Sequence, residues 1–270
     1  MERAHEVDYQ IFGDDIQFVE ISLDYGETIV AEPGAMMYMD SSIEMDTVFG
    51  DGSGKESSKG LKGILATAGK RVLTGENLFT STFTNKGLGK KALAFAAPYP
   101  GKIIPVELMT YGGQLICQRD SYLCSAKGIE ISIAFQKKIG AGLFGGEGFI
   151  MQKLLGDGLA FLHAGGTIIK KELSAGEILK IDTGCLVAFT AGVDYDVQFV
   201  GNVKSALFGG EGLFLATLKG PGTIWLQSLP FSRMADRIFS ASKKAGGGNS
   251  SKGEGSLLGG IGIGNLFGQD

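Results

Sequence analysis

The sequence has few of the residues that usually build metal centres and catalytic sites. Its 270 residues include two histidines, His5 and His163, and three cysteines. No His-x-His or Cys-x-x-Cys spacing occurs, which argues against a zinc site because zinc needs several nitrogen or sulfur ligands in close sequence groups. We therefore interpret His163 and the cysteines as core residues and His5 as part of a frayed terminus. A Cys–His catalytic pair stays open as an alternative, because such partners meet in space and not in sequence.

The cysteines also bear on the compartment. Cys117, Cys124 and Cys185 are odd in number and lie in apolar runs, which is typical of buried free thiols in a reducing environment. The first residues form no apolar signal segment. No run of about 18 apolar residues offers a membrane-spanning helix. These features together predict a cytoplasmic protein.

Positive charge is also in short supply. The formal net charge is −4, whereas nucleic-acid binding depends on Lys and Arg side chains that neutralise phosphates. The lysines are scattered, and no set of aromatic residues among basic ones suggests a stacking platform. Nucleic acid is therefore not an expected partner. The segment 50–56 resembles a phosphate loop but has Glu56 where Ser or Thr is required, so we interpret it as a linker.

What the sequence has in abundance is glycine, 44 residues in all, and it recurs within a repeated motif. A glutamate follows glycine at Glu76, Glu147 and Glu211, in Gly-Glu-Asn-Leu-Phe, Gly-Gly-Glu-Gly-Phe and Gly-Gly-Glu-Gly-Leu contexts. Self-similarity of this kind determines architecture before any single motif is considered. It predicts three related β units.

Two further blocks recur in the same order. A turn, a short strand and a polar turn with an acid occupy 26–34, 113–121 and 176–184, each followed by a strand at 35–39, 122–126 and 185–189. Segments with largely alternating polarity, typical of half-buried strands, occupy 43–49, 129–135 and 193–199. Short strands at regular spacing favour a sandwich or barrel over a parallel sheet.

The expected fold is all-β, with three homologous β units around a pseudo-threefold axis and a C-terminal helix. Turns at Lys86-Gly87, Asp157-Gly158 and Pro221-Gly222 lie between apolar runs and predict a hairpin in each unit. The N-terminal segment 7–12 belongs to no complete unit. We expect it to pair near the last unit and to help close the ring.

The predicted boundaries are a single β domain at 1–240, with repeats at about 13–95, 101–162 and 165–230, and a flexible Gly-rich tail at 241–270. Two segments depart from the repeat, namely 50–72 and everything after Pro230. Residues 59–72 combine basic residues with a short apolar stripe, as in a helix that packs on a barrel or lies on a membrane surface. Residues 257–267 are apolar and Gly-rich, which fits either a disordered end or a docking peptide.

The Gly-Glu-x-Leu-Phe pattern at 75–79, its echoes at 145–148 and 209–212, the segment 32–36 and the Gly- and Leu-rich end resemble one family. It is the mitochondrial-biogenesis family named for altered inheritance of mitochondria, with its uncharacterised prokaryotic relatives. The resemblance spans roughly residues 5–240. It implies a fold similar to that of the tryptophan RNA-binding attenuator protein, and it supplies no catalytic residues.

The repeated glutamates Glu76, Glu147 and Glu211 are the candidate site, because equivalent carboxylates near an axis would face a cation or a basic partner. The interpretation that we favour over such a site is that each glutamate simply lies at a glycine-capped turn. The function that the sequence favours is a non-enzymatic scaffold or interaction protein. We expect it to bind a protein partner or to form a homo-oligomer, with no cofactor, no metal and no catalytic residue. A membrane-peripheral role through 59–72 or 257–267 and a small-ligand or metal-binding enzyme are the alternatives.

Overall fold

The structure, a computed structural model, describes residues 3–49, 79–137, 149–199 and 214–245. These residues form four antiparallel sheets and one C-terminal helix, α3 (Phe231–Ala245), so the largely β class and the helix are confirmed. The chain divides into two units, Met1–Arg233 and Met234–Asp270. No helix in the described ranges is both long and apolar enough to cross a membrane.

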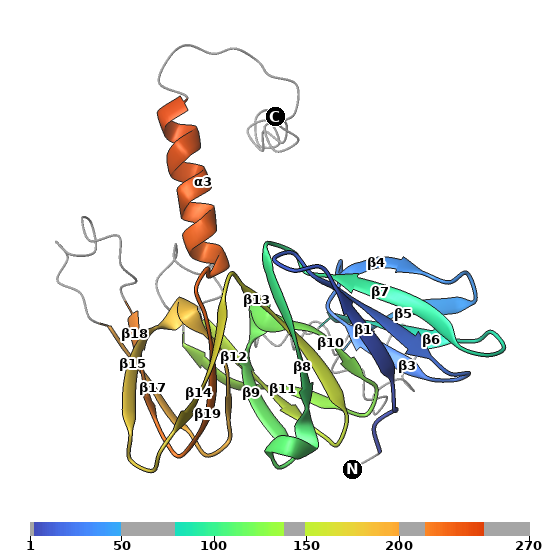
Figure 1. Cartoon of the computed structure of the whole chain (residues 1–270), viewed down its shortest axis with the longest axis horizontal. Helices are drawn as coiled ribbons and strands as arrows, with labels where there is room; N and C mark the ends of the chain where they lie inside the picture. The colour runs from blue at the N-terminus through green and yellow to red at the C-terminus, as the bar shows by residue number, and fades with distance from the viewer. Residues whose placement is uncertain (1–2, 50–78, 138–148, 200–213, 246–270) are drawn as a thin grey trace, which may run out of the picture. The chain divides into compact units, whose positions relative to one another are not determined.

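The first two sheets contain all the strands from β1 to β7, which are blue to teal in Figure 1. Sheet A has four strands, in the order β1 (Asp8–Phe12), β2 (Phe18–Leu23), β7 (Lys91–Ala96) and β4 (Met36–Met39). Sheet B has six, in the order β5 (Ile43–Phe49), β6 (Phe79–Asn85), β3 (Thr28–Ala31), β10 (Tyr122–Ala126), β13 (Leu159–Gly165) and β8 (Gly101–Glu107).

The other two sheets contain the later strands. Sheet C has the order β11 (Glu130–Lys137), β12 (Phe149–Leu155), β9 (Gln114–Gln118), β16 (Leu186–Thr190), β19 (Gly222–Gln227) and β14 (Ile168–Leu173). Sheet D has the order β15 (Ile178–Asp182), β18 (Phe214–Lys219) and β17 (Asp194–Phe199). Short 3-10 turns η1 (Leu108–Tyr111), η2 (Arg119–Ser121) and η3 (Thr183–Cys185) connect neighbouring strands.

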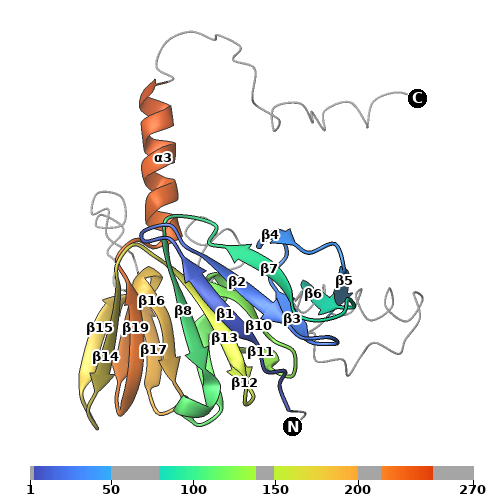
Figure 2. The same cartoon turned by 45° about the vertical axis from the view of Figure 1, so that its right-hand side comes forward.

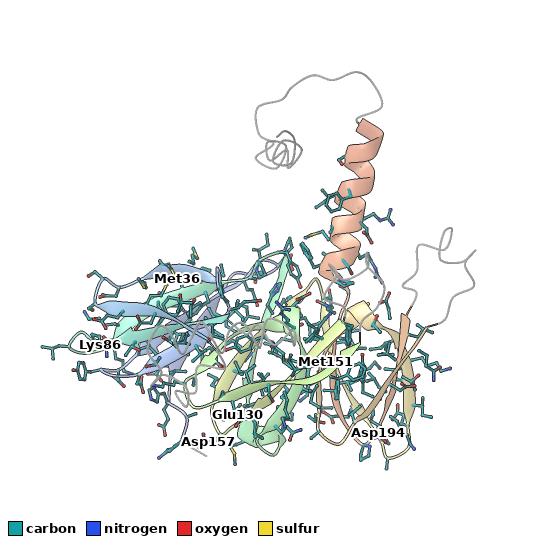
Figure 3. All side chains as sticks on the ribbon, turned by 180° about the vertical axis from the view of Figure 1, so that it is seen from behind. Met36, Lys86, Glu130, Met151, Asp157 and Asp194 are labelled. Carbon is teal, nitrogen blue, oxygen red and sulfur yellow. The ribbon has the colours of Figure 1, made fainter. Side chains whose placement is uncertain are left out.

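Three clusters of buried apolar side chains lie between these sheets. Core 1 contains Val19, Ile21 and Phe95 of sheet A with Phe83 of sheet B. Core 2 lies between sheets B and C, and core 3 lies between sheets C and D. Met36 of sheet A and Asp194 of sheet D stand at opposite ends of this series, with Met151 of sheet C between them (Figure 3).

The strands in the middle of sheets B and C are covered on both faces. Along β13, Phe161 packs in core 1 while its neighbours Ala160 and Leu162 pack in core 2. A strand that is buried on both sides has no solvent face, so its sequence is a continuous apolar run and does not alternate. This requirement explains the run Leu159-Ala160-Phe161-Leu162 and the fully buried β10.

The predicted hairpins are wrong. The strands on either side of the three turns do not pair: β6 lies in sheet B and β7 in sheet A, β12 in C and β13 in B, and β18 in D and β19 in C. Each turn therefore carries the chain across a core from one sheet to the facing sheet. The Asp-Gly signal marks a tight reversal of the chain, but apolar residues on both strands allow face-to-face packing as well as edge-to-edge pairing.

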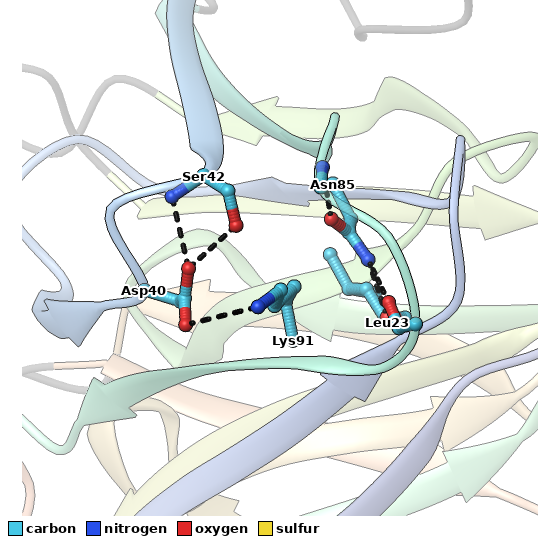
Figure 4. Close-up of polar contacts among 7 residues, drawn as sticks. Leu23, Asp40, Ser42, Asn85 and Lys91 are labelled. Carbon is cyan, nitrogen blue, oxygen red and sulfur yellow. Dashed lines mark hydrogen bonds and ion pairs between the residues drawn. The ribbon is translucent and has the colours of Figure 1, made fainter.

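The first of these reversals depends on one buried amide. Asn85, with no solvent exposure, donates from Nδ2 to the carbonyl oxygens of Leu23 (2.8 Å) and Gly89 (2.9 Å). Its Oδ1 accepts from the Gly87 amide at 2.8 Å. Figure 4 shows the Asn85–Leu23 contact next to the Asp40–Ser42 turn. Because the side chain satisfies backbone groups that the turn leaves without strand partners, it fixes the path between sheets B and A.

The expected place of the N-terminal strand is also wrong. β1 pairs with β2 in sheet A, with Tyr9 opposite Ile21, and not with the last strands of the chain. A short turn at Gly13, with φ of 87°, makes this local pairing the cheaper one because it closes a small loop. Nor is His5 frayed, because its Nδ1 accepts from the Thr28 amide at 2.9 Å.

Replacing Asn85 with alanine should lower the free energy of unfolding by roughly 1–3 kcal/mol, since buried backbone groups lose their partners. Urea denaturation of the full chain measures the change. Gln10→Ala, at an exposed position of β1, is the control and should shift stability by no more than about 0.5 kcal/mol. Equal effects of the two substitutions would contradict the role given to Asn85.

Candidate functional site

The glutamates proposed from sequence lie outside the described residues. Glu76, Glu147 and Glu211 all fall in the gaps of the structure, as do segments 59–72 and 257–267. Their convergence therefore stays a prediction. The candidate site must be built from the strands that the structure does describe.

Cys117, Cys124 and His163 are placed as core residues, whereas Cys185 is half-buried and lies 3.8 Å from the Arg233 guanidinium. Cys117 and Cys124 are buried and unpaired, and burial raises the pKa of the Cys117 thiol to about 12, so it is a poor nucleophile. His163 is buried, its Nε2 lies 3.1 Å from the Tyr99 carbonyl oxygen, and burial lowers its pKa to about 4. No group of three or more His, Cys, Asp or Glu suited to a metal ion occurs among the described residues.

One titratable group was missed by the sequence interpretation. Glu32, directly after β3, was seen only as the acid of a polar turn. Burial and the charge of Asp120 raise its pKa to about 7, against the opposing effect of Arg119. Its amide donates to the Leu123 carbonyl oxygen of β10 at 3.0 Å. Glu32 therefore lies next to the pairing of β3 with β10 in the middle of sheet B. The sequence could not show that Asp120 lies close enough to Glu32 to raise its pKa.

Sheets B and C each have such a junction at their middle. In sheet B, β3 pairs with β10, and Ala31 lies opposite Cys124. In sheet C, β9 pairs with β16, and Cys117 lies opposite Ala188. Both junctions are antiparallel and join three residues of each strand. The two six-stranded sheets are therefore built in the same way, three strands on each side of a junction.

The strand after each junction shares a second feature. The β10–β13 pairing shifts register between Tyr122 and Cys124, and the β16–β19 pairing shifts between Leu186 and Ala188. The β4–β7 pairing of sheet A has the same shift between Met36 and Tyr38. β4 is thus the counterpart of β10 and β16. The counterpart of β3 and β9 is β15, which is followed directly by the three-residue turn η3, as β9 is followed by η2.

This comparison corrects the aligned blocks by one residue. The pairings place Met36, Tyr122 and Leu186 in register, whereas the sequence blocks began at 35, 122 and 185. The double glycine Gly112-Gly113 caused the slip, because the middle block was begun at Gly113. In a strand, a slip of one residue moves each side chain to the opposite face, so the correction decides which residues face which core.

β4 and β15 are sheet edges, although their counterparts are not. In the described part of the chain, β4 has β7 as its one neighbour and β15 has β18. β10 is fully buried, but Met37 and Tyr38 on β4 are 55% and 40% exposed, and Ile178 on β15 is 58% exposed. The outer N–H and C=O groups of an edge strand are a template for pairing with another strand.

The open edge β4 is held in place by its neighbours. At its end, Asp40 accepts from the Ser42 amide at 2.9 Å and lies 3.7 Å from the Lys91 ammonium (Figure 4). The Tyr38 hydroxyl donates to the Glu20 carboxylate of β2. These contacts present an ordered apolar strand and not a loose loop, and an ordered strand loses less conformational entropy on binding.

The described residues define a largely β protein whose edge strands β4 and β15 carry exposed apolar side chains. The chain belongs to the family described as mitochondrial biogenesis AIM24, whose model matches residues 9–229. The resemblance drawn from sequence is thereby confirmed.

Its similarity to two streptococcal proteins agrees with this family. An uncharacterized protein of Streptococcus pyogenes serotype M6 is 30% identical over 224 residues, which are 82% of this chain and 84% of that protein. A crystal structure of a Streptococcus pyogenes protein has a TM-score of 0.70 and 23% identity, and the match covers 87% of this chain and 100% of the other. This second likeness concerns the fold alone.

Glu32→Gln should make the protein more stable at neutral and alkaline pH. Because the folded-state pKa of about 7 exceeds the ordinary 4.5, the folded chain binds this proton more tightly than the unfolded chain. That stabilisation is complete below about pH 4.5 and is lost as the pH rises through 7. The variant should match the wild type near pH 4 and exceed its free energy of unfolding by roughly 1–3 kcal/mol near pH 8.

Urea denaturation at a series of pH values measures this difference. Glu44→Gln, on the exposed side of β5, is the matched control and should leave the pH dependence unchanged. A wild-type and Glu32→Gln difference that stays constant from pH 4 to pH 8 would show that Glu32 titrates normally.

Proposed function

We propose that this protein is a non-enzymatic scaffold or interaction protein that associates through its open sheet edges. The observation that carries the proposal is the exposed strand β4, whose four residues are three methionines and a tyrosine. Methionine-rich surfaces adapt to a partner because the side chain is unbranched and polarizable. Tyrosine is enriched at interfaces, where its ring is buried and its hydroxyl is satisfied.

The second part of the proposal is that three homologous units build the β domain around a pseudo-threefold axis. Constant offsets of 86 and 64 residues support the homology, since they relate two sets of equivalent positions: Met36, Tyr122 and Leu186, and Ile43, Ile129 and Val193. The same turn precedes each of the latter three. Their amides donate to the carbonyl oxygens of Asp40, Ala126 and Thr190 at 3.0, 3.4 and 3.0 Å.

A cytoplasmic location completes the proposal, and the unpaired Cys117 and Cys124 support it, because free thiols are typical of reducing compartments. For the alternative, an enzyme that binds a small ligand or a metal in the interior or near the axis, the described residues offer no cluster of metal ligands. Side chains of Phe, Leu and Ile fill the three cores. Contact with a membrane through 59–72 or 257–267 rests on sequence alone.

A capture experiment tests the interaction role. Tagged full-length wild type and the double variant Met37→Lys/Tyr38→Lys are used to capture proteins from lysate of the native host. Lysine on an edge strand opposes strand pairing, so the double variant should retain roughly a tenth or less of the captured protein, the loss expected of central contacts. Leu88→Lys, at a 92% exposed position in the turn before β7, is the control.

The captured proteins are quantified by mass spectrometry, with the untagged chain counted separately from all others. Capture that depends on β4 supports an interaction protein whichever species is found. Identical capture by the wild type, the β4 variant and the Leu88→Lys control would contradict the proposal, as would turnover of any metabolite by the purified chain.

A further inference from the structure

We propose that strand β15 of a second copy of this chain pairs with β4 in a head-to-tail contact that rebuilds the junction found inside sheets B and C. This inference rests on the proposed function and specifies the partner, the two strands and their register. The partner follows from the molecule itself. β15 is the counterpart of the first strand of each junction and β4 is the counterpart of the second, but neither is paired in this way within the described chain.

The first argument is the pattern of neighbours. β3 and β9 each have strands on both sides, and so do β10 and β16. β15, the counterpart of the first pair, and β4, the counterpart of the second, each lack the neighbour that would complete a third junction in the described part of the chain. Among the remaining edge strands, β5, β11 and β17 are edges at all three counterpart positions. β8 and β14 are also edges, whereas their counterpart β2 pairs with the N-terminal strand β1.

The second argument is the way in which the cores are closed. Core 1 includes four residues from beyond the β3–β10 junction, which are Ile103, Leu123, Cys124 and Phe161. Core 2 is closed by the corresponding residues beyond the β9–β16 junction, which are Ile168, Val187, Ala188 and Trp225. Core 3, among described residues, receives no such set. The next junction would have to supply it, and the described residues contain no fourth unit.

The positions that correspond to these closing residues lie on the outer face of sheet A. By the same strand registers they are Phe18, Met37, Tyr38 and Ala94. All four are apolar or aromatic. Met37 and Tyr38 on β4 are exposed, Phe18 is half-buried, and Ala94 on the inner strand β7 is buried. An apolar face of this kind on a strand with no covering neighbour is typical of an interaction surface. Sheet A of one copy thus presents apolar side chains at the positions that would cover core 3 of another copy.

The two internal junctions give the expected register. Ala31 lies opposite Cys124, and Cys117 lies opposite Ala188. Cys117 stands two residues before η2, and Ile181 stands two residues before η3. Tyr38 corresponds to Cys124 and Ala188, so the intermolecular pairs are Tyr38 with Ile181 and Met39 with Lys180. Ile181 packs against core 3 and Met39 against core 1, as their counterparts do.

The arrangement in space favours a second copy over pairing within one chain. β4 and β15 do not pair with each other, and they lie on opposite sides of the set of sheets in both views (Figures 1 and 2). A head-to-tail contact leaves one open β4 and one open β15 at the ends of each assembly. Association therefore continues until a ring closes or a filament forms.

Cysteine pairing between two variants tests the register. Both variants also carry Cys185→Ser. Serine is chosen because Ser121 is the natural residue at the position that corresponds to Cys185. Tyr38→Cys and Ile181→Cys place cysteine where its counterparts Cys124 and Cys117 already occur. The full-length single variants are mixed under mild oxidation, and the expected product is a covalent dimer joined through positions 38 and 181, identified by mass spectrometry.

The control mixes Tyr38→Cys with Lys180→Cys, because adjacent residues of a strand point to opposite faces. This mixture should give at most about a tenth of the cross-linked product. Equal cross-linking in the two mixtures, or none at positions 38 and 181, would overturn the proposal. So would a disulfide within one chain of the double variant Tyr38→Cys/Ile181→Cys at high dilution, because the two edges would then close on each other.

Mass in solution gives an independent readout. Sedimentation of the full-length wild type should show an assembly of two or more chains, and Met37→Lys/Tyr38→Lys should shift it to the single-chain mass while circular dichroism stays that of a β protein. Leu88→Lys should keep the wild-type mass. A wild-type chain that stays monomeric would overturn the self-pairing. If β4-dependent capture of other proteins persisted, the interaction role would still stand.

Discussion

Buried backbone N–H and C=O groups must find hydrogen-bond partners, and for the inner strands of sheets B and C this means a neighbouring strand on each side. The chain meets this requirement in sheets B and C by joining three strands from one stretch of sequence to three from the next, through β3–β10 and β9–β16. The junctions then determine which strands are buried on both faces, where the cores lie and where Glu32 is positioned. They also leave β4 and β15 at sheet edges, whereas their counterparts are paired on both sides.

Core packing follows from the same arrangement. β10 and β13 carry side chains into core 1 on one face and core 2 on the other, which is why they lack polar alternation. β4 has a similarly apolar sequence but stands at an edge. Its composition is that of a covered strand, and its position in this single chain is that of an uncovered one. The conflict between local sequence and local environment is the strongest physical reason to regard this surface as functional.

The sequence predicted much of the local structure, and its failures have particular causes. Recurrent blocks located the strands around Ile29, Met37 and Leu93, because apolar runs between glycine turns determine strands locally. The same blocks could not tell a hairpin from a chain reversal across a core, since Asp157-Gly158 permits both. The double glycine before β9 hid a one-residue offset. Glu32 looked like an ordinary turn acid because the sequence does not reveal that Asp120 comes near it. The repeated glutamates, which drew attention first, fall outside the residues that the structure describes.

The central claim is that β4 and β15 are paired strands in the working form of the protein. Hydrogen exchange of the full chain, followed strand by strand at increasing protein concentration, tests it most directly, because amides in paired strands exchange slowly. The account predicts that amides of β4 and β15 become protected together as concentration rises, approaching the protection of β3 and β10, while β5 and β17 do not change. Fast exchange in both strands at every concentration, with β3 and β10 protected throughout, would contradict it.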